Sequence, residues 1–319
     1  MLLDKLRVAV VGGSIAGHLN ALSLMRHGAS VTVFERSSKN SFTDRGVGIG
    51  VPTAVVNAVK ELGYFSDNVK HDNCPEFKRI VPSSEYPREG KLLWLQPVPF
   101  ELMSWSEIFN QFNGQIPEEN IHYNAKVVEV GMIGDKAFVL LQDDGVKQEF
   151  DLVIGADGYL STARKFVSPT SSPAFAGYVL WRGGIPEADL VAMNLVTPSH
   201  EGFSVVFLPD CGGHLAMFFV RKPSGERVLT WGVYIPVPEA DFLHVMTDKD
   251  GQVHTHSIPP GMVQPALEKE WKDRALANMP SDYSSIIAAS EDTFIQGIFD
   301  MEVSSLVRNC VVLSGMYLG

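Results

Sequence analysis

The chain has 319 residues, 45% of them hydrophobic and 20% charged, and 26 Lys and Arg against 37 Asp and Glu give a formal net charge of −11. This length and composition predict a globular protein of two domains and exclude disordered, collagen-like and coiled-coil chains. The acidic balance argues against nucleic acid as a main partner, and no apolar run approaches the roughly 20 residues that cross a membrane as a helix.

The first fifty residues predict a strand, a helix and a second strand. Arg7–Val11 is a β-branched run typical of a buried parallel strand. A helix is expected from Ile15 to His27, where Gly28 ends it as a C-cap glycine, and Val31–Glu35 is the second strand. This order favours a right-handed crossover and a parallel sheet.

The rest of the chain predicts more strands than helices. Helices are expected at 52–62, 105–112 and 261–277, and strands at 127–130, 137–142, 146–151, 152–155, 178–181, 204–208, 215–220, 228–235 and 310–313. Turn chemistry at 131–135 and 143–145 separates the first three of these strands. The fold class is therefore α/β, with a Rossmann-like parallel sheet and a second, β-rich layer.

The turn after the first strand has the spacing of a dinucleotide-binding fingerprint. It reads Gly12-Gly13-Ser14-Ile15-Ala16-Gly17, with Ser14 in place of the second glycine of G-x-G-x-x-G. Small residues there let the backbone approach a pyrophosphate, and the helix N-terminus offers free N–H groups. Glu35 is placed to bind an adenosine ribose, which argues against NADP at this site. The alternative is a tight turn that uses small residues for packing alone.

A second motif runs from Asp151 to Gly158 and is followed by Ser161 and Arg164. A strand ends at Gly155, and Asp157-Gly158 opens a helix that carries a cation in its first turn. The Asp157 carboxylate could hold a sugar hydroxyl, but by residue chemistry alone an Asp-Gly pair is more often only a turn.

Together the two motifs resemble those of the FAD-dependent aromatic hydroxylases, which have the para-hydroxybenzoate hydroxylase fold. The segments 175–183 and 242–257 are similar, more narrowly, to dihydroxypyridine hydroxylase and its relatives. The resemblance covers essentially the whole chain. It implies an FAD-binding domain at 1–77, 101–172 and 286–319 and a β-rich substrate domain at 78–100 and 173–285.

The resemblance also implies a set of cofactor-binding residues. The FAD pyrophosphate would lie against the turn from Gly12 to Gly17, and Glu35 would bind the adenosine ribose with Arg36 beside it. Arg45 and Gly48 belong to the loop that approaches the flavin, and Asp157 and Gly158 to the motif that contacts FAD and NAD(P)H. These positions are Gly12, Gly13, Ser14, Ile15, Ala16, Gly17, Glu35, Arg36, Arg45, Gly48, Asp157 and Gly158.

The implied activity is hydroxylation of an aromatic or N-heteroaromatic small molecule with NAD(P)H and O2, through a flavin hydroperoxide. In this chemistry the cofactor does most of the work, while the protein positions the ring and excludes water. Trp181 and Arg182 stand on the sheet that covers the flavin and lines the substrate pocket in the family. No side chain is identified as a catalytic base, and NADH and NADPH both remain open as co-substrate.

The chain departs from the family pattern after Gly315. A Gly-Asp motif is expected there, whose Asp holds the ribityl chain, but Met316-Tyr-Leu-Gly319 follows instead. We therefore expect a truncated product that binds FAD poorly and is prone to aggregate, since a lost charge-assisted hydrogen bond costs about 1.5–3 kcal/mol. The alternatives to a working hydroxylase are an inactive, flavin-poor remnant and another FAD oxidoreductase on the same fold, such as a reductase.

Other patterns favour structural interpretations. His254-x-His256 lacks an evident third ligand and is expected to be a solvated loop, so no metal is predicted. Asp248-Lys-Asp250 is expected to be a surface turn, and the five Trp to be core or interface residues. No signal peptide or Cys pair is apparent, which predicts a reducing, cytoplasmic compartment. The oligomeric state stays open, with a homodimer as one option.

Overall fold

The computed structural model describes residues 5–42, 48–143, 145–197, 202–210 and 212–315. The chain divides into two compact units. Unit 1 comprises Met1–Asp44, Ile108–Ala174 and Phe299–Gly319, and unit 2 comprises Arg45–Glu107 and Phe175–Ile298. The assignment of FAD binding to one domain and substrate binding to the other stays a prediction.

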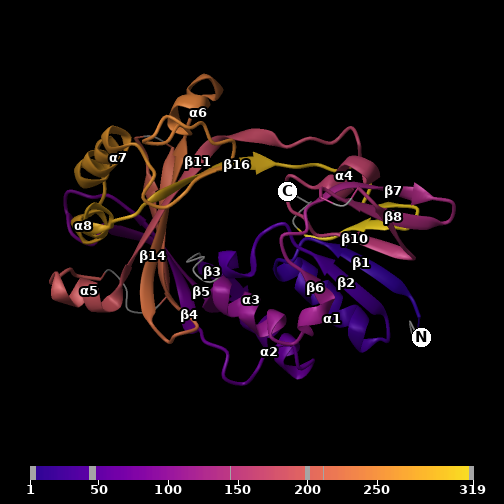
Figure 1. The fold of residues 1–319 in the computed structure, drawn as a ribbon. Helices are drawn as coiled ribbons and strands as arrows, with labels where there is room; N and C mark the ends of the chain where they lie inside the picture. Colours follow the sequence, from indigo (N-terminus) through magenta and orange to yellow (C-terminus); the bar gives the residue numbers. More distant parts are fainter. Residues whose placement is uncertain (1–4, 43–47, 144, 198–201, 211, 316–319) are drawn as a thin grey trace. The chain divides into compact units, whose positions relative to one another are not determined.

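Among its described residues, unit 1 is built on a six-stranded sheet in the order β17-β18-β10-β1-β2-β6 (Figure 1). Its strands are β1 (Arg7–Val11), β2 (Ser30–Phe34), β6 (Ile121–His122), β10 (Leu152–Gly155), β17 (Val307–Arg308) and β18 (Val311–Leu313). All neighbours are parallel except β17 and β18. Parallel strands of this kind are buried on both faces, which explains their nearly continuous β-branched sequence.

Helices and a small antiparallel sheet cover the six-stranded sheet. The helical elements that unit 1 contains or shares are α1 (Ile15–Arg26), η1 (Lys39–Phe42), α3 (Trp105–Asn113), η2 (Glu118–Asn120) and α4 (Thr162–Val167). The three-stranded sheet is β7 (Val127–Ile133), β8 (Lys136–Leu141) and β9 (Lys147–Phe150). Val130, Val139 and Phe150 pack in one core cluster with Val11 of β1 and Val311 of β18. This cluster seals one face of the parallel sheet.

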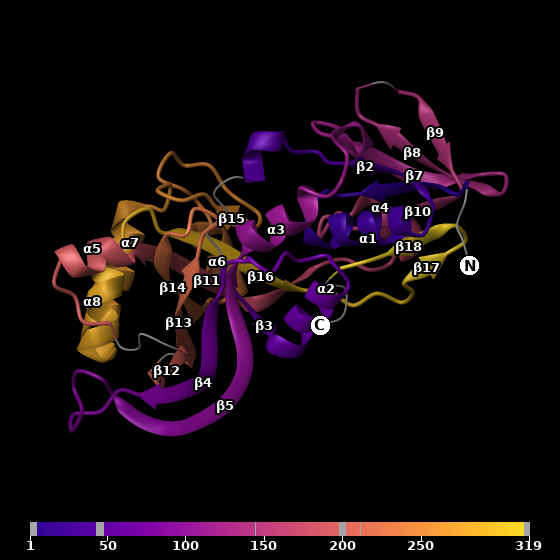
Figure 2. The ribbon, with the colours of Figure 1, turned by 90° about the horizontal axis from the view of Figure 1, so that it is seen from below.

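Unit 2 is built on a strongly curved sheet of nine strands among the described residues, in the order β15-β16-β11-β14-β13-β12-β4-β5-β3. The strands are β3 (Gly48–Pro52), β4 (Asp72–Val81), β5 (Lys91–Ser104), β11 (Ala174–Pro186), β12 (Phe203–Leu208), β13 (Gly213–Arg221), β14 (Arg227–Pro236), β15 (Ser257–Ile258) and β16 (Phe294–Asp300). Figure 2 shows the long, bent hairpin of β4 and β5. Register shifts between Cys74 and Glu76 and between Arg79 and Ile80 interrupt this pairing, as expected where a strand bends.

Helices cover one face of the β11–β14–β13 region. They include α7 (Pro265–Asn278) and α8 (Ser281–Ala289), which lie side by side (Figure 1). The shorter helices of unit 2 are α2 (Thr53–Glu61), α5 (Glu187–Ala192) and α6 (Glu239–Val245). The largest core cluster forms between helices and sheet and contains Trp181, Trp231 and Trp271. The Trp231 indole donates a 2.7 Å hydrogen bond to Ser290 Oγ, which satisfies its buried N–H.

Most elements expected from periodicity are present within one to four residues of their predicted ends. The sequence missed β4 and β5, because Pro75, Pro97 and Pro99 interrupt them and proline is usually excluded from strands. It also missed α6 and α8. The turn expected at 131–135 is shorter, since β7 continues to Ile133.

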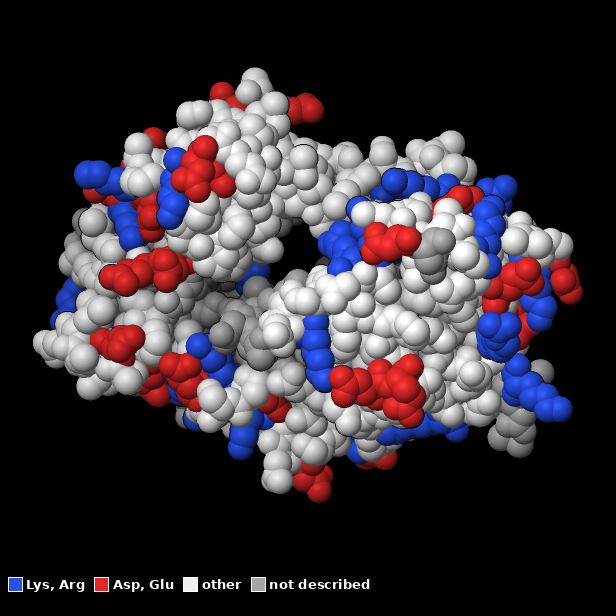
Figure 3. Space-filling view, in the orientation of Figure 1, with Lys and Arg blue, Asp and Glu red and all other residues white. Residues whose placement is uncertain are grey.

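Three of the five tryptophans, Trp181, Trp231 and Trp271, are buried, as expected, but Trp94 is 54% exposed. The Arg79 guanidinium stacks over its ring at 4.6 Å. The face in Figure 3 carries interspersed acidic and basic side chains among the described residues. In the part of the chain that the structure describes, no helix is long and apolar enough to cross a membrane.

Truncating the side chain of Ile286 tests whether helix α8 packs in the core of unit 2. Ile286 of α8 is 0% exposed, whereas Leu276 of α7 is 51% exposed. We expect Ile286→Ala to lower the free energy of unfolding by about 2–5 kcal/mol, because it leaves a cavity in the core. Leu276→Ala is the matched control and should change it by less than about 1 kcal/mol. Equal losses in denaturant titrations of the two variants would contradict this packing.

Candidate functional site

The fingerprint turn of unit 1 is held by close contacts between backbones. Gly12 has φ +102°, and a Cβ placed on it would lie 2.4 Å from the carbonyl oxygen of Ala156. A Cβ on Gly17 would lie 1.8 Å from the carbonyl oxygen of Gly12. Both positions therefore require glycine. The contacts bring the turn after β1 against the turn after β10, so the two sequence motifs meet at the carboxyl edge of one sheet.

The N-terminus of α1 opens at this edge. Ser14 is the N-cap residue and makes no side-chain cap, and the first backbone bond of the helix runs from His18 N to the Ser14 carbonyl. The N–H groups of Ile15, Ala16 and Gly17 precede that bond and lack intrahelical acceptors. Such N–H groups and the helix dipole favour a bound anion.

Glu35 lies beside the turn, as the sequence predicts. Its side chain is buried, and its two oxygens accept 2.7 Å hydrogen bonds from Gly13 N and Ser37 N. A Cβ on Gly13 would lie 2.9 Å from Glu35 Cβ. A carboxylate offers about four acceptor positions, so Glu35 keeps the capacity to accept from ribose hydroxyls. The neighbouring Arg36 is exposed.

Asp157 organises the second motif. Its carboxylate accepts hydrogen bonds from Ser161 Oγ, from Thr162 N at 2.6 Å and from Ala163 N at 3.3 Å. Burial raises the pKa of Asp157, and these hydrogen bonds oppose that rise. Its visible role is thus to hold the start of α4, while Gly158, with φ +74° and open space around it, forms the exposed tip of the turn.

The strand expected at the end of the chain joins the same edge. Leu313 of β18 pairs with Gly155, and Ser314 N donates to the Gly155 carbonyl. Asn20 of α1 donates a 2.8 Å hydrogen bond to Ser314 Oγ. The carboxyl ends of β1, β10 and β18 are therefore neighbours. The expected departure from the family at Met316 lies outside the described residues.

The structure reveals three residues near these turns that sequence reasoning did not select as binding residues. His18 is fully buried, with its ring edge on Phe109 and its Nδ1 donating to the Ser14 carbonyl at 3.1 Å. Burial lowers the pKa of His18. Sequence spacing could have indicated it, since His18 stands one turn after Ser14.

Tyr159 and Arg164 are the other two residues near these turns that were not selected as binding residues. The Tyr159 ring stacks on Phe299, and burial raises its pKa to about 12, with nearby Arg36 acting in the opposite direction. Arg164 is 3% exposed, and its Nε and Nη1 have no acceptor among the described residues. Burying a guanidinium whose N–H groups have no acceptor costs free energy of folding. The free N–H groups of Arg164 therefore suit an acceptor atom of a ligand.

The remaining predicted cofactor-binding positions belong to unit 2 or lie outside the described residues. Arg45 is outside the described residues. Gly48 begins β3, and a Cβ there would lie 2.4 Å from the Phe218 ring and 2.9 Å from the Thr230 methyl group. Thus the described end of the 45–50 loop packs tightly against the sheet of unit 2.

Trp181 and Arg182 point to opposite faces of that sheet, because neighbours on a strand alternate. Trp181 is buried against Trp271 in the helix-covered core. Arg182 donates to Gln296 Oε1 at 2.9 Å and lies over the Phe294 ring. Burial lowers the pKa of Arg182, and nearby Tyr234 opposes this. Only one of the two side chains can therefore face any one side of the sheet, and the assignment of Trp181 and Arg182 to a substrate pocket stays a prediction.

The His254-x-His256 segment forms a loop held by hydrogen bonds. His254 Nε2 lies 2.7 Å from Asp248 Oδ2, and His256 Nδ1 lies 2.6 Å from Thr255 Oγ1. Asp248 is only 3% exposed, so the expected surface turn has a buried anchor. The hydrogen bond between Asp248 and His254 holds the pKa of Asp248 below its usual range. Among the described residues, no three His, Cys, Asp or Glu side chains are grouped to hold a metal ion.

Comparisons with known proteins identify relatives of this chain. A family model described as FAD binding domain-like matches residues 175–300. The chain is 30% identical over 311 residues to 2,6-dihydroxypyridine 3-monooxygenase of Paenarthrobacter nicotinovorans, and the match covers 91% of this chain and 74% of that protein. It is 24% identical to a 3-amino-4-hydroxybenzoate 2-monooxygenase of Streptomyces platensis, over 96% of this chain and 69% of that one.

Comparison of the fold with solved structures identifies proteins of the same kind. The structure of 2,6-dihydroxypyridine-3-hydroxylase from Arthrobacter nicotinovorans superposes with a TM-score of 0.83 at 25% identity, covering 97% of this chain and 76% of that one. The fold is thus that of the para-hydroxybenzoate hydroxylase type. The chain belongs to the family of FAD-dependent aromatic hydroxylases.

The buried state of His18 predicts a pH dependence. Because burial lowers its pKa in the folded chain, the unfolded chain takes up the proton first as the pH falls below about 6.5. Neutral His18 therefore makes its full contribution to the free energy of unfolding above pH about 6.5. Below that pH the contribution is lost, by up to about 1.4 kcal/mol per pH unit.

We expect His18→Gln to reduce this loss, measured as the free energy of unfolding from pH about 7 to 5. His27→Gln, which replaces an exposed histidine at the end of the same helix, is the control. An unchanged pH profile for His18→Gln would contradict the assignment.

Proposed function

We propose that this chain binds FAD at the edge formed by β1, β10 and β18 and hydroxylates a small aromatic or N-heteroaromatic molecule with NAD(P)H and O2. One observation carries the proposal: a glycine turn, an open helix N-terminus and a buried acidic residue converge at this edge in a chain of this family. Bound FAD, reduced by NAD(P)H, would supply the oxygen-activating chemistry.

The residues of unit 1 suit the two ends of such a dinucleotide. The turn has no side chain at Gly12, Gly13 and Gly17, where a Cβ would collide with the protein. A pyrophosphate could therefore approach the backbone N–H groups at the start of α1. Glu35 would accept from the adenosine ribose, with Arg36 at the exposed rim. Asp157 would act by holding the turn that presents Gly158, and Arg164 supplies buried, unpartnered N–H groups nearby in sequence.

In unit 2, the substrate is proposed to bind on the face of the sheet opposite helices α7 and α8. Gly48, from the loop assigned to the flavin, packs on that face against Phe218 and Thr230. Arg182 and Tyr234 lie on the same face, and Tyr234 stacks on His214 with ring centroids 4.4 Å apart. Aromatic rings and a half-buried cation suit a planar, electron-rich ring that carries partial negative charge.

The finer parts of the proposal concern the co-substrate, the compartment and the assembly. The acid at position 35 disfavours a ribose phosphate in the adenosine part of this site but leaves NADH and NADPH equally open as reductants. We place the enzyme in the cytoplasm, and we retain a homodimer as one possible assembly.

Replacing Glu35 tests the FAD site. A Gln has one acceptor oxygen in place of two, so Glu35→Gln would lose one of the bonds to Gly13 N and Ser37 N and would turn an amide donor toward an N–H. We expect the Kd for FAD to rise about ten- to hundredfold, corresponding to about 1.5–3 kcal/mol. The measurement is a fluorescence titration of FAD.

Glu129→Gln is the matched control, because Glu129 is an exposed carboxylate on β7 of the same unit, paired loosely with Lys147 at 3.7 Å. It should bind FAD as the parent chain does. Parental affinity in Glu35→Gln would contradict the ribose assignment, and no FAD binding by the parent chain would favour the flavin-poor remnant.

Substrate-stimulated NAD(P)H oxidation tests the activity. The full chain with added FAD is assayed with 2,6-dihydroxypyridine, 3-amino-4-hydroxybenzoate and salicylate, recording NAD(P)H absorbance and dissolved O2 together. A hydroxylase consumes the two in about equal amounts, because one oxygen atom enters the ring and the other leaves as water. NAD(P)H oxidation without O2 uptake would instead support the reductase alternative.

A further inference from the structure

The sheet of unit 2 has one long free edge. Strand β3 pairs with β5 only at residues 100–104, whereas β4 pairs with β5 along its other side from Lys91 onward. In the part of the chain that the structure describes, no strand lies along the outer side of residues 91–99. Backbone N–H and C=O groups on such an edge are open to pairing with another strand.

This edge carries a run of exposed apolar side chains, which we call the apolar edge. Its members are Leu92, Leu93, Trp94 and Leu95, and each of them is between 42% and 56% exposed. The register shift in the β4–β5 hairpin leaves Leu93 with no residue opposite it on β4, and Leu93 is the most exposed of the four. A contiguous group of large apolar side chains on a surface marks a contact site.

The tip of the hairpin holds the apolar edge in place. The Ser281 N–H at the start of α8 donates a 3.0 Å hydrogen bond to the Pro87 carbonyl. A Cβ on Gly90 would lie 2.6 Å from Ile80 Cγ2 and 2.8 Å from Pro280 Cγ. The hairpin is therefore packed against α8, and a partner would meet an ordered strand whose binding costs little conformational entropy.

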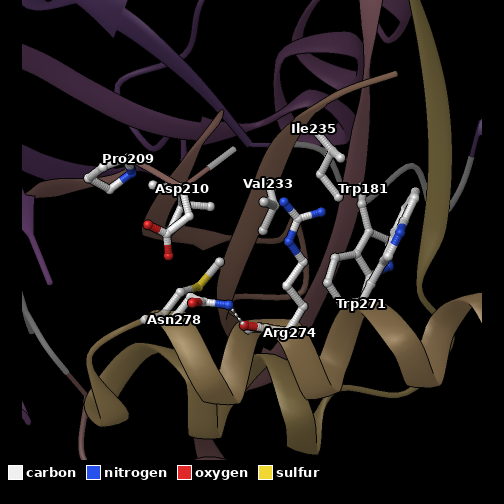
Figure 4. A pocket seen from close by; sticks show the side chains of 11 residues that line it. Trp181, Pro209, Asp210, Val233, Ile235, Trp271, Arg274 and Asn278 are labelled. Atoms are coloured by element: carbon white, nitrogen blue, oxygen red, sulfur yellow. Dashed lines mark hydrogen bonds between the residues drawn. The ribbon is translucent and has the colours of Figure 1, made fainter. Parts of the chain in front are cut away.

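Other parts of the same sheet are covered or short. Figure 4 shows Trp181 and Val233 of the sheet and Trp271 and Arg274 of α7 around the space between the two layers. This space is a cavity of about 40 Å³, which admits a few waters. Among the described residues, the opposite edge of the sheet is β15, which has two residues, Ser257–Ile258.

Charge and symmetry favour a second copy of this chain as the partner. Between Gly90 and Phe100 the only charged residue is Lys91, although the chain has a net charge of −11. Repulsion between two acidic copies is therefore weak along this strand. Two identical strands can lie antiparallel across a two-fold axis, so that each copy offers the other the same surface. Because β15 is too short to extend the contact, the assembly closes at two copies.

The area of the apolar edge is sufficient for a weak dimer. Four large apolar side chains that are about half exposed present roughly 400 Å² on one copy. Both copies contribute, together with the backbone of the paired strands, so the contact buries roughly 1,000–1,200 Å² in total. This area is at the lower limit for specific interfaces, which predicts a dimer in equilibrium with its monomers.

We propose that two copies of this chain associate through the apolar edge, with their β5 strands antiparallel across a two-fold axis. Leu93 lies at the axis, and Leu92 and Trp94 of one copy pack against the same residues of the other. The two nine-stranded sheets then form one continuous sheet. This interface depends neither on FAD binding nor on hydroxylation.

Sedimentation equilibrium of the full chain at about 1–200 µM, with and without FAD, tests the proposal. We expect a monomer–dimer equilibrium with a Kd on the order of 10 µM. Leu93→Lys should raise this Kd about tenfold or more, because it places a charge at the centre of the contact. Leu243→Lys is the matched control: Leu243 of α6 is 60% exposed, and the same change of charge there should leave the Kd unchanged.

Hydrogen exchange locates the contact in the sequence. The amides of residues 91–96 should exchange about fivefold more slowly at about 200 µM than at about 1 µM, since exchange then requires dissociation. Amides of α6 should exchange equally at both concentrations. In Leu93→Lys the difference at 91–96 should disappear. Trp94→Ser, which adds no charge, should raise the Kd about three- to tenfold through the loss of apolar contact.

Three results would overturn the proposal. The first is a monomer at every concentration, and the second is a dimer whose Kd is the same in Leu93→Lys and Trp94→Ser as in the parent chain. The third is an equal rise of the Kd in Leu243→Lys. Circular dichroism verifies that each variant is folded. A chain that dimerises in this way but does not bind FAD would contradict the proposed function alone.

Discussion

The absence of side chains at Gly12 and Gly17 is the constraint on which unit 1 depends. With a Cβ at Gly17 only 1.8 Å from the Gly12 carbonyl oxygen, helix α1 could not begin where it does. With a Cβ at Gly12, the turn after β1 could not rest on Ala156. These contacts set the first strand, its helix and the second motif at one edge of the sheet, and they expose the helix N-terminus there.

Buried polar groups around this edge differ in how well they are satisfied. Glu35 and Asp157 accept several hydrogen bonds each and so hold backbone turns in place. His18 Nε2 and two nitrogens of Arg164 have no partner among the described residues. The satisfied carboxylates rigidify the site, and the unsatisfied nitrogens are the places where a bound ligand would add most.

The alternation of side chains along β11 gives unit 2 two different surfaces. Trp181 enters the core beneath α7, whereas the next residue, Arg182, faces Gln296 and Phe294 on the other side. One strand therefore contributes to both the proposed substrate face and the cavity behind it. The two faces share a backbone but no side chain.

Local sequence determined the fingerprint turn, the strand–helix–strand unit and the position of Glu35, because glycine conformations, capping and β-branched runs act over a few residues. It also carried enough family pattern to indicate an FAD-dependent hydroxylase. Tertiary structure alone decided which side of the sheet Trp181 and Arg182 occupy, that Asp248 anchors a loop from a buried position, and that the proline-containing β4 and β5 pair as strands. Each of these depends on partners far away in sequence, and burial or pairing by such partners is not encoded in the spacing of neighbouring residues.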